Sequence, residues 1–281
     1  MTGPVRLGAV SYLNVRPLVH GLDQRPDAVT LRFDVPSECA RLLASGEIDL
    51  GMVPSIAWLD RPGDCIVPGV CIGSDGPVAS VALFTKRPIG DVRSIALDTS
   101  SRTSVALVRI LCARRFRISP AFIPHSPDLG AMLASADAAL VIGDLALFAD
   151  HRAYTADKID LGAMWTEVTG LPFVWAFWSG RPDAVRADTV TLLQAAAEEG
   201  MAHSDEIAAA YCVHDPARVL TAQRYLRENL AFRLSPRALD GLRTFYKEAE
   251  RLGLVERAAE PAFFHPGQSA IMGTDAGRPN R

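Results

Sequence analysis

The chain has 281 residues, of which 49% are hydrophobic and 22% charged, a make-up that suits a globular protein of one large domain or two lobes. A formal net charge of −3 leaves no basic field for a polyanion, which argues against nucleic acid as a partner. The five cysteines lie far apart without a C-x-x-C pair, so we expect buried free thiols rather than a disulfide framework or a zinc site.

The beginning of the sequence gives no room for a targeting segment. Met-Thr-Gly-Pro runs directly into the strand-like residues 5–10, without the charged region, apolar stretch and cleavage site of a signal peptide. No uncharged apolar run approaches the roughly 18 to 20 residues that a membrane helix requires. We therefore expect a cytoplasmic protein with no membrane partner.

Strand-like and helix-like segments alternate through the first two thirds of the chain, which predicts an α/β fold. The predicted strands are 5–10, 48–53, 79–85, 94–98, 138–142 and 172–178. The predicted helices are 15–22, 37–45, 103–115 and 127–135. From Asp188 to Leu252 the pattern is helical throughout and is best divided into three helices, with Pro216 and Pro236 in first turns and Ser235 as an N-cap.

An internal similarity divides the α/β part into two halves. Residues 42–53 read like residues 132–143: each begins as a helix, turns, and continues as a buried strand. A serine precedes each helix as an N-cap candidate, Ser37 in the first half and Ser126 in the second. The two halves therefore look like versions of one α/β unit.

Upstream in each half, a strand delivers polar side chains to a helix start, at 11–14 and at 99–104. Free backbone N–H groups, hydroxyls and the positive end of a helix dipole then lie together, which suits a carboxylate. Plain N-capping explains many such clusters, but six candidate donors at 99–104 exceed what a cap needs. Because open α/β sheets bind ligands at the carboxyl ends of their strands, we expect the pocket in a cleft between two lobes.

Four motifs in sequence order resemble the signature series of the chorismate dehydratase family, and the resemblance extends from Leu7 to about Gly253. The motifs are Ser11-Tyr12-Leu13-Asn14-x-x-Pro17-Leu18, Asp98-Thr99-Ser100-Ser101-x-Thr103-Ser104, Ile142-Gly143-Asp144, and Asp160-Leu161-Gly162-x-x-Trp165-x-x-x-Thr169-Gly170-Leu171-Pro172.

This resemblance implies the two-lobed α/β fold of type II periplasmic binding proteins, with a ligand cleft between the lobes. The chain would cross between the lobes at strands 81–85 and 173–177. We expect lobe 1 to comprise residues 1–91 and 176–257, and lobe 2 residues 92–175. Residues 258–281, rich in Gly, Pro and polar side chains, are expected to form a flexible tail.

The family's reaction removes water from chorismate to give 3-[(1-carboxyvinyl)oxy]benzoate in the futalosine route to menaquinone. The pocket must hold two carboxylates and assist one proton transfer. The expected substrate-binding residues are Ser11, Tyr12, Ser80, Ser100, Ser101, Thr103, Ser104, Gly143 and Thr169. Arg16 and Arg102 are candidate charge partners, and Trp165, Phe173, Trp175 and Trp178 candidate walls for the ring, although most such aromatic residues belong to the core.

Two residues are candidates for the chemistry itself. Asn14 could orient the substrate, although an amide cannot act as a base and a turn role is equally consistent with its position. Asp144 is the one carboxylate inside these motifs placed as a candidate base, but Gly-Asp after a strand is also a common helix N-cap. We therefore favour the substrate's own enolpyruvyl carboxylate as the proton acceptor.

The sequence contains no metal-binding or nucleotide-binding motif, so we expect no metal and no cofactor. Two other functions use the same fold. The 1,4-dihydroxy-6-naphthoate synthase family has a Cys-Pro-Asn-Asp type opening, whereas this chain has Ser-Tyr-Leu-Asn. A carboxylate-binding transport protein would perform no chemistry and would be exported.

Overall fold

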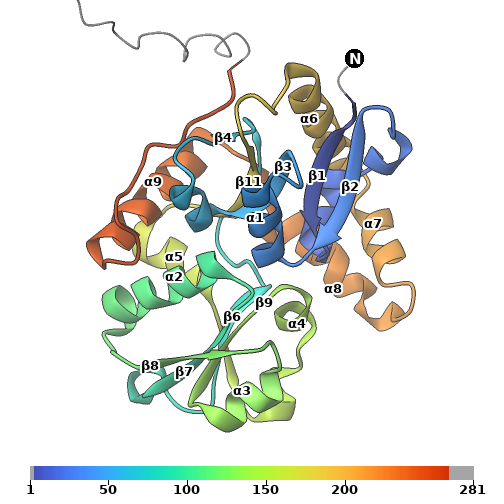
Figure 1. Ribbon diagram of the computed structural model, residues 1–281. Helices are drawn as coiled ribbons and strands as arrows, with labels where there is room; N and C mark the ends of the chain where they lie inside the picture. Colours follow the sequence, from blue (N-terminus) through green and yellow to red (C-terminus); the bar gives the residue numbers. More distant parts are fainter. Residues whose placement is uncertain (1–2, 266–281) are drawn as a thin grey trace, which may run out of the picture.

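A computed structural model describes residues 3–265, without the side chain of Ser37, and has two sheets in two lobes (Figure 1). The first sheet has the order β12-β5-β11-β3-β1-β2, with β4 also on β11. Its strands are β1 (Val5–Val10), β2 (Val29–Asp34), β3 (Leu50–Pro54), β4 (Cys65–Ile66), β5 (Val70–Ser74), β11 (Phe173–Gly180) and β12 (Ala231–Arg233).

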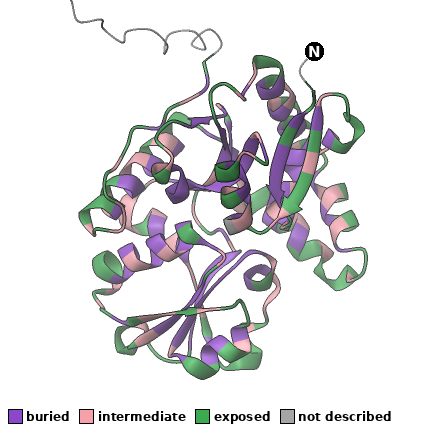
Figure 2. Cartoon of the chain, viewed as in Figure 1, coloured by how far each residue is buried: buried purple, intermediate pink, exposed green. Residues whose placement is uncertain are grey.

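The second sheet has the order β10-β6-β9-β7-β8 and lies below the first in Figure 1. Its strands are β6 (Val81–Thr85), β7 (Ser94–Asp98), β8 (Ala121–His125), β9 (Ala138–Ile142) and β10 (Asp157–Asp160). In Figure 2 most of its strands are buried, while the helices around the sheet carry one buried and one exposed side. Apolar burial between the layers therefore stabilises each lobe.

Helices cover both sheets, and most of them follow or precede a strand along the chain. The α-helices are α1 (Pro36–Ser45), α2 (Arg102–Leu111), α3 (Leu129–Ser135), α4 (Gly143–Phe148), α5 (Leu161–Thr169), α6 (Ala187–Ala202), α7 (Ser204–Tyr211), α8 (Val219–Arg224) and α9 (Pro236–Arg251). The 3-10 helices that matter for the site are η1 (Leu13–Val19) and η3 (Ser55–Asp60).

The predicted internal repeat is present as topology. In one sheet β1 lies parallel between β2 and β3, and in the other β7 lies parallel between β8 and β9. Parallel strands need a crossover connection, and a helix provides it in each unit: α1 connects β2 to β3, and α3 connects β8 to β9. The carboxyl ends of β1 and β7 thus deliver η1 and α2 to equivalent positions in the two lobes.

Several local predictions need correction. Ser37 lies inside α1, because Val35 occupies the N-cap position and Pro36 begins the helix. In α3 the cap is Asp128, whose carboxylate accepts from the Ala131 N–H, and not Ser126. Residues 188–252 are not helical throughout as three helices: they form α6, α7, α8 and α9, with strand β12 between α8 and α9. The Ser235 prediction is confirmed, since its hydroxyl oxygen accepts from the Ala238 N–H.

The lobe boundaries also differ from the expected ones. Strand β6 belongs to the second sheet, where it pairs with β9 and β10. The first crossing therefore lies in residues 75–80, just before the expected strand 81–85, and lobe 1 does not extend to residue 91. The end of the chain is less loose than its composition suggested. Residues 262–264 pair with Ile66, and Phe264 is buried; residues 266–281 lie outside the described part.

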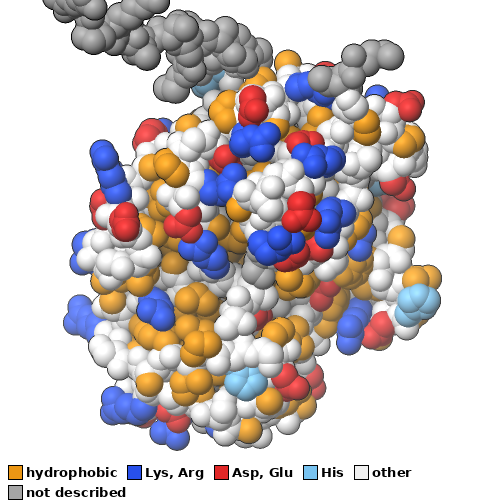
Figure 3. Space-filling view, in the orientation of Figure 1, with side chains coloured by type: hydrophobic (Ala, Val, Ile, Leu, Met, Phe, Trp, Pro, Cys, Tyr) orange, Lys and Arg blue, Asp and Glu red, His pale blue; other side chains and the backbone are white. Residues whose placement is uncertain are grey.

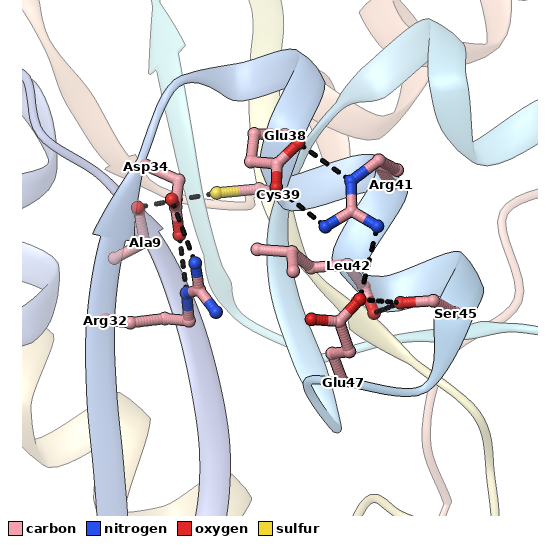
Figure 4. Close-up of polar contacts among 9 residues, drawn as sticks. All are labelled: Ala9, Arg32, Asp34, Glu38, Cys39, Arg41, Leu42, Ser45 and Glu47. Atoms are coloured by element: carbon pink, nitrogen blue, oxygen red, sulfur yellow. Dashed lines mark hydrogen bonds and ion pairs between the residues drawn. The ribbon is translucent and has the colours of Figure 1, made fainter.

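Arginine and lysine side chains gather on the face of the first lobe in Figure 3, with carboxylates among them. Figure 4 shows part of this surface, where Arg41 of α1 pairs with Glu38 at 2.8 Å and with Glu47 at 3.2 Å. Arg32 pairs with Asp34 at 2.7 Å on the neighbouring strand β2. Exposed pairs of this kind contribute about 0 to 1 kcal/mol each, so they do not hold the lobes together.

Candidate functional site

A cavity lies where the two lobes meet, with an empty volume of about 580 Å³ including its open mouth. Both helix starts that the sequence singled out contribute to it, η1 through Tyr12 and Asn14 and α2 through Ser101, Thr103 and Ser104. The other lining residues are Val10, Val15, Pro36, Met52, Pro54, Ile72, Val78, Ser80, Val81, Ile142, Gly143, Trp175 and Ala176. The wall is therefore mostly apolar, with a few convergent polar groups, as in many small-molecule sites.

The start of α2 gathers hydroxyl groups at the cavity. Ser101 is the N-cap and accepts from the Ser104 N–H at 3.3 Å, while its hydroxyl donates to Ser104 Oγ at 2.9 Å. Thr103 Oγ1 lies 3.3 Å from the Ile56 N–H and 3.4 Å from Ser55 Oγ of the first lobe. These three α2 side chains are nearly fully buried. A helix start in such a dry setting favours an anion.

A second polar group consists of Asn14 and Ser80, which line the cavity, and Tyr225, which contacts Ser80. The Tyr225 hydroxyl donates to Ser80 Oγ at 2.7 Å. Burial raises the pKa of Tyr225, against hydrogen bonds with Ser80 and Asn14 that lower it, so the phenol stays protonated. Asn14 Oδ1 is buried and has no hydrogen-bond partner among residues 3–265. A buried amide oxygen of this kind has acceptor capacity for a bound ligand or an ordered water.

Asp144 is turned away from the cavity and joins the two lobes. Its carboxylate accepts from the Leu13 N–H at 3.2 Å and from the Tyr211 hydroxyl. Asp144 does not cap its own helix, since the N-cap of α4 is Ile142, but it satisfies an N–H at the start of η1 in the other lobe. Burial raises the pKa of Asp144, and the hydrogen bonds from Tyr211 and Leu13 oppose that rise.

Comparison with known proteins places this arrangement in a family. A family model described as menaquinone biosynthesis matches residues 5–251. A chorismate dehydratase of Thermus thermophilus is 32% identical over 276 residues, which are 89% of this chain and 96% of that protein. The chain belongs to the menaquinone biosynthesis family.

Solved structures of lower identity share the fold of this family member. A protein of Archaeoglobus fulgidus superposes with a TM-score of 0.71 at 15% identity, covering 90% of this chain and 98% of that one. The periplasmic aliphatic sulphonate binding protein of Escherichia coli gives a TM-score of 0.66 at 17% identity, covering 100% and 98%. The predicted α/β periplasmic-binding-protein fold is therefore confirmed. Within residues 3–265, no helix is both long and apolar enough to span a membrane.

The structure separates the sequence-predicted residues of this menaquinone biosynthesis protein into two groups. Tyr12, Asn14, Ser80, Ser101, Thr103, Ser104 and Gly143 line the cavity. Four others do not: Asp144 bonds to Leu13 and Tyr211, Ser11 is exposed, Ser100 donates to the Asp98 carboxylate at 2.6 Å, and Thr169 donates to the Trp165 carbonyl at 2.8 Å. Gly143 has φ +64° and faces the Tyr12 ring, which a Cβ at this position would meet at 3.1 Å.

The charged and aromatic candidates also separate. Arg102 pairs with Asp60 at 2.6 Å, and Arg16 lies over the rings of Phe33 and Tyr211 at 4.5 and 5.4 Å, so neither arginine lines the cavity. Of the four aromatic residues, Trp175 lines the cavity and donates to Ser74 Oγ at 3.1 Å. The other three, Trp165, Phe173 and Trp178, lie in the core.

Sequence reasoning missed two tyrosines that support the site from the C-terminal helices, Tyr225 behind Ser80 and Tyr211 beside Asp144. Both lie in a segment whose sequence pattern is simply helical, and their partners are 145 and 67 residues away. The described part of the chain holds one group that could bind a metal, His20, Glu199 and His203, on the outside of the first lobe. None of these three lines the cavity.

Asp144 provides a test of how the lobes are joined. Because the pKa of Asp144 is raised, the folded state binds the proton of this carboxyl more tightly than the unfolded state does. The contribution of this group to the free energy of unfolding therefore falls as pH rises from the unfolded pKa of about 3.9 through the folded pKa. We expect Asp144→Asn, which keeps one acceptor oxygen, to leave the free energy of unfolding at pH 7 unchanged or higher. Asp144→Ala should lower it by about 1 to 3 kcal/mol, because the Leu13 N–H loses its acceptor and the Tyr211 hydroxyl keeps only the Ser11 carbonyl at 3.2 Å. Urea unfolding at pH 4 and pH 7 measures both, and equal losses in the two variants would contradict this account.

The cysteines are free and buried, as predicted. Burial raises the pKa of Cys65 to about 11, and that of Cys39, Cys71 and Cys112 to about 12; Cys39 also donates to the Ala9 carbonyl in Figure 4. The thiolate is the reactive form, so we expect iodoacetamide at pH 8 to leave these four cysteines unmodified in the native protein and to label them in urea. Peptide mass spectrometry reads this directly, and rapid native labelling of Cys71 would contradict the packing.

Proposed function

We propose that this protein is a chorismate dehydratase, a hydro-lyase that converts chorismate to 3-[(1-carboxyvinyl)oxy]benzoate and water in menaquinone biosynthesis by the futalosine pathway. The family membership and the 32% identity to a chorismate dehydratase support this. The observation that carries the proposal is the chemistry of the cavity wall. Among the described lining residues, Tyr12 alone has a titratable side chain, so the site offers neutral donors and a polarised helix start rather than a strong base.

The α2 start is suited to one carboxylate of chorismate through Ser101, Thr103 and Ser104 and the N–H groups of the first turn. Ser80, which also lines the cavity, would donate to the second carboxylate. Asn14 would accept from the ring hydroxyl that departs, and its unpartnered buried oxygen supports this role. The whole set orients a rigid dianion through neutral groups, and orientation by itself can contribute several kcal/mol to a unimolecular step.

The proton transfer can then be internal to the substrate. The enolpyruvyl carboxylate takes the proton from the ring carbon that bears the ether, the C–H electrons form the new ring double bond, and hydroxide leaves the adjacent carbon. The hydroxide takes up the transferred proton and departs as water, so atoms and charge balance. Burial raises the pKa of Tyr12, against a hydrogen bond with Ser100, so this phenol stays protonated and is unsuited to act as the base.

The test is to mix purified protein with chorismate in a buffer containing a chelator and to follow the ultraviolet spectrum and the product mass. We expect a new aromatic absorbance and a product lighter by one water. Unchanged chorismate would overturn the proposal in favour of a carboxylate-binding protein or the related naphthoate synthase. A substrate analogue without the enolpyruvyl carboxylate should bind without reacting, and its turnover would contradict internal proton transfer while leaving the dehydratase proposal intact.

A further inference from the structure

The first crossing between the lobes ends in a strained turn just before Ser80. Ala79 has φ +63°, a left-handed conformation that costs an L-residue about 1 to 2 kcal/mol. The Ser80 N–H donates to the Val78 carbonyl at 2.7 Å, and the Ser80 carbonyl accepts from the Gly143 N–H at 2.8 Å. A conformation of this kind persists only where its surroundings hold it in place.

The carboxylate of Asp160 is the group that holds this turn. Its Oδ1 accepts from the Val78 N–H at 3.0 Å, and its Oδ2 accepts from the Ala79 N–H at 2.6 Å. Oδ1 also caps α5 by accepting from the Ala163 N–H at 3.0 Å. One side chain therefore fixes the start of α5 and the backbone at both residues that precede Ser80.

Two further residues of the same sequence motif contact the crossing segment. A Cβ on Gly162 would lie 2.6 Å from the Gly76 carbonyl oxygen, so only glycine lets the segment approach α5 this closely. Thr166 Oγ1 accepts from the Gly76 N–H at 3.1 Å. Asp160, Gly162 and Thr166, at the start and on one side of α5, thus form a contact surface for residues 76–79, which we call the seat.

The residue that directly follows the seated segment is Ser80, which lines the cavity. This side chain is 1% exposed, lines the cavity and is held by the Tyr225 hydroxyl. A backbone change at Ala79 would turn Ser80 and disturb the hydrogen bond that it receives from the Tyr225 hydroxyl. We propose that Asp160 is a positioning residue for substrate binding, acting through Ala79 to aim the Ser80 hydroxyl at a carboxylate of the substrate. This inference rests on the proposed function, and it extends that function to a residue outside the cavity.

Asp160→Asn tests the inference with little change in shape. The amide oxygen can still cap the Ala163 N–H, but the amide nitrogen now faces the Ala79 N–H, donor against donor. We expect the KM for chorismate to rise about tenfold with kcat nearly unchanged, as for a lost uniform binding contact. Adding Ala79→Gly, which relieves the left-handed strain, should restore much of the KM. Asp128→Asn, the same change at the N-cap of α3, is the matched control and should have no effect on KM.

A double-mutant cycle distinguishes positioning from a general structural role. In a Ser80→Ala background, Asp160→Asn should raise KM no further, because the group that it aims is gone. The inference would be overturned if the two substitutions raised KM independently, so that their factors multiplied in the double variant. A wild-type KM in Asp160→Asn would overturn it as well. If Asp160→Asn fails to fold, Thr166→Val weakens the same seat without touching the cap and enters the same cycle.

Failure of the proposed function would be visible separately, as a wild-type protein that leaves chorismate unchanged. A readout without substrate keeps the inference testable in that case. Amide hydrogen exchange at Ala79 should speed up at least tenfold in Asp160→Asn and not in Asp128→Asn, since only the former loses the oxygen that accepts from the Ala79 N–H. Equal exchange in the two variants would overturn the assignment of Asp160 regardless of the substrate.

Discussion

Replacing Asn14 with alanine is expected to lower kcat for chorismate dehydration by about 10²- to 10³-fold, the usual cost of removing one preorganised polar group from a reaction site. Asn14 Oδ1 is buried in the cavity and has no partner in the described structure, so its acceptor capacity is available to the substrate. Without it, the ring hydroxyl loses the group that orients its departure. Single-turnover and steady-state kinetics on the purified variant measure this loss.

The control for Asn14→Ala is another half-buried amide outside the cavity. Gln194 donates to the Pro68 carbonyl at 2.9 Å and does not line the site. Gln194→Ala should therefore leave kcat and KM within about twofold of wild type. An Asn14→Ala enzyme with near wild-type kcat would show that the amide supports only the turn at the start of η1.

Gly200→Ala is expected to destabilise the protein by about 1 to 3 kcal/mol, the range for overpacking a close-packed interface. Alanine in a helix interior is ordinarily favoured over glycine by about 0.5 to 1 kcal/mol, so the sign depends on the contact. A Cβ on Gly200 of α6 would lie 2.0 Å from the Pro17 carbonyl oxygen of η1, a backbone atom that cannot rotate away. The helices must separate, and η1 carries Asn14 to the cavity, so kcat should fall as well.

A matched substitution reverses the expected sign. A Cβ on Gly130 of α3 would meet its nearest neighbours at 3.5 Å, which is ordinary contact, so Gly130→Ala should keep or slightly raise stability. Urea unfolding gives the free energy of unfolding of each variant, and the substitution, glycine to alanine in a helix, is the same in both. If the Gly200→Ala protein had the same free energy of unfolding as the Gly130→Ala protein, α6 and η1 would not pack as closely as described.

The strongest sequence signals identified elements that are buried on both faces. Strands 5–10, 94–98 and 138–142 were predicted at their observed bounds because continuous apolar runs have few alternatives to a central strand. The prediction missed β2, an edge strand, although its residues Val-Thr-Leu-Arg-Phe-Asp alternate between apolar and polar as in a half-buried strand. It chose Ser126 over Asp128 because both residues suit an N-cap and only the path of the chain decides between them.

For the site, the sequence predicted which turns would supply donors but not which side chains would turn inward. Ser100 and Ser101 are adjacent hydroxyls in one motif, yet Ser101 caps α2 at the cavity while Ser100 turns to Asp98. Asp144 had two readings within its own helix, as base and as cap. The observed role, an acceptor for the other lobe, depends on how the lobes meet and is invisible to local spacing.

The sequence by itself determined the α/β class, the duplicated strand-helix unit, the free thiols and the family resemblance, because these depend on apolar periodicity and on residue types in order. Only the tertiary structure decided that the first crossing lies in residues 75–80, that Tyr225 and Tyr211 reach the site, and that Asp160 seats the turn before Ser80. These features join residues about 70 to 145 positions apart. Such contacts arise from the packing of complete elements against one another, and local sequence preferences carry no information about them.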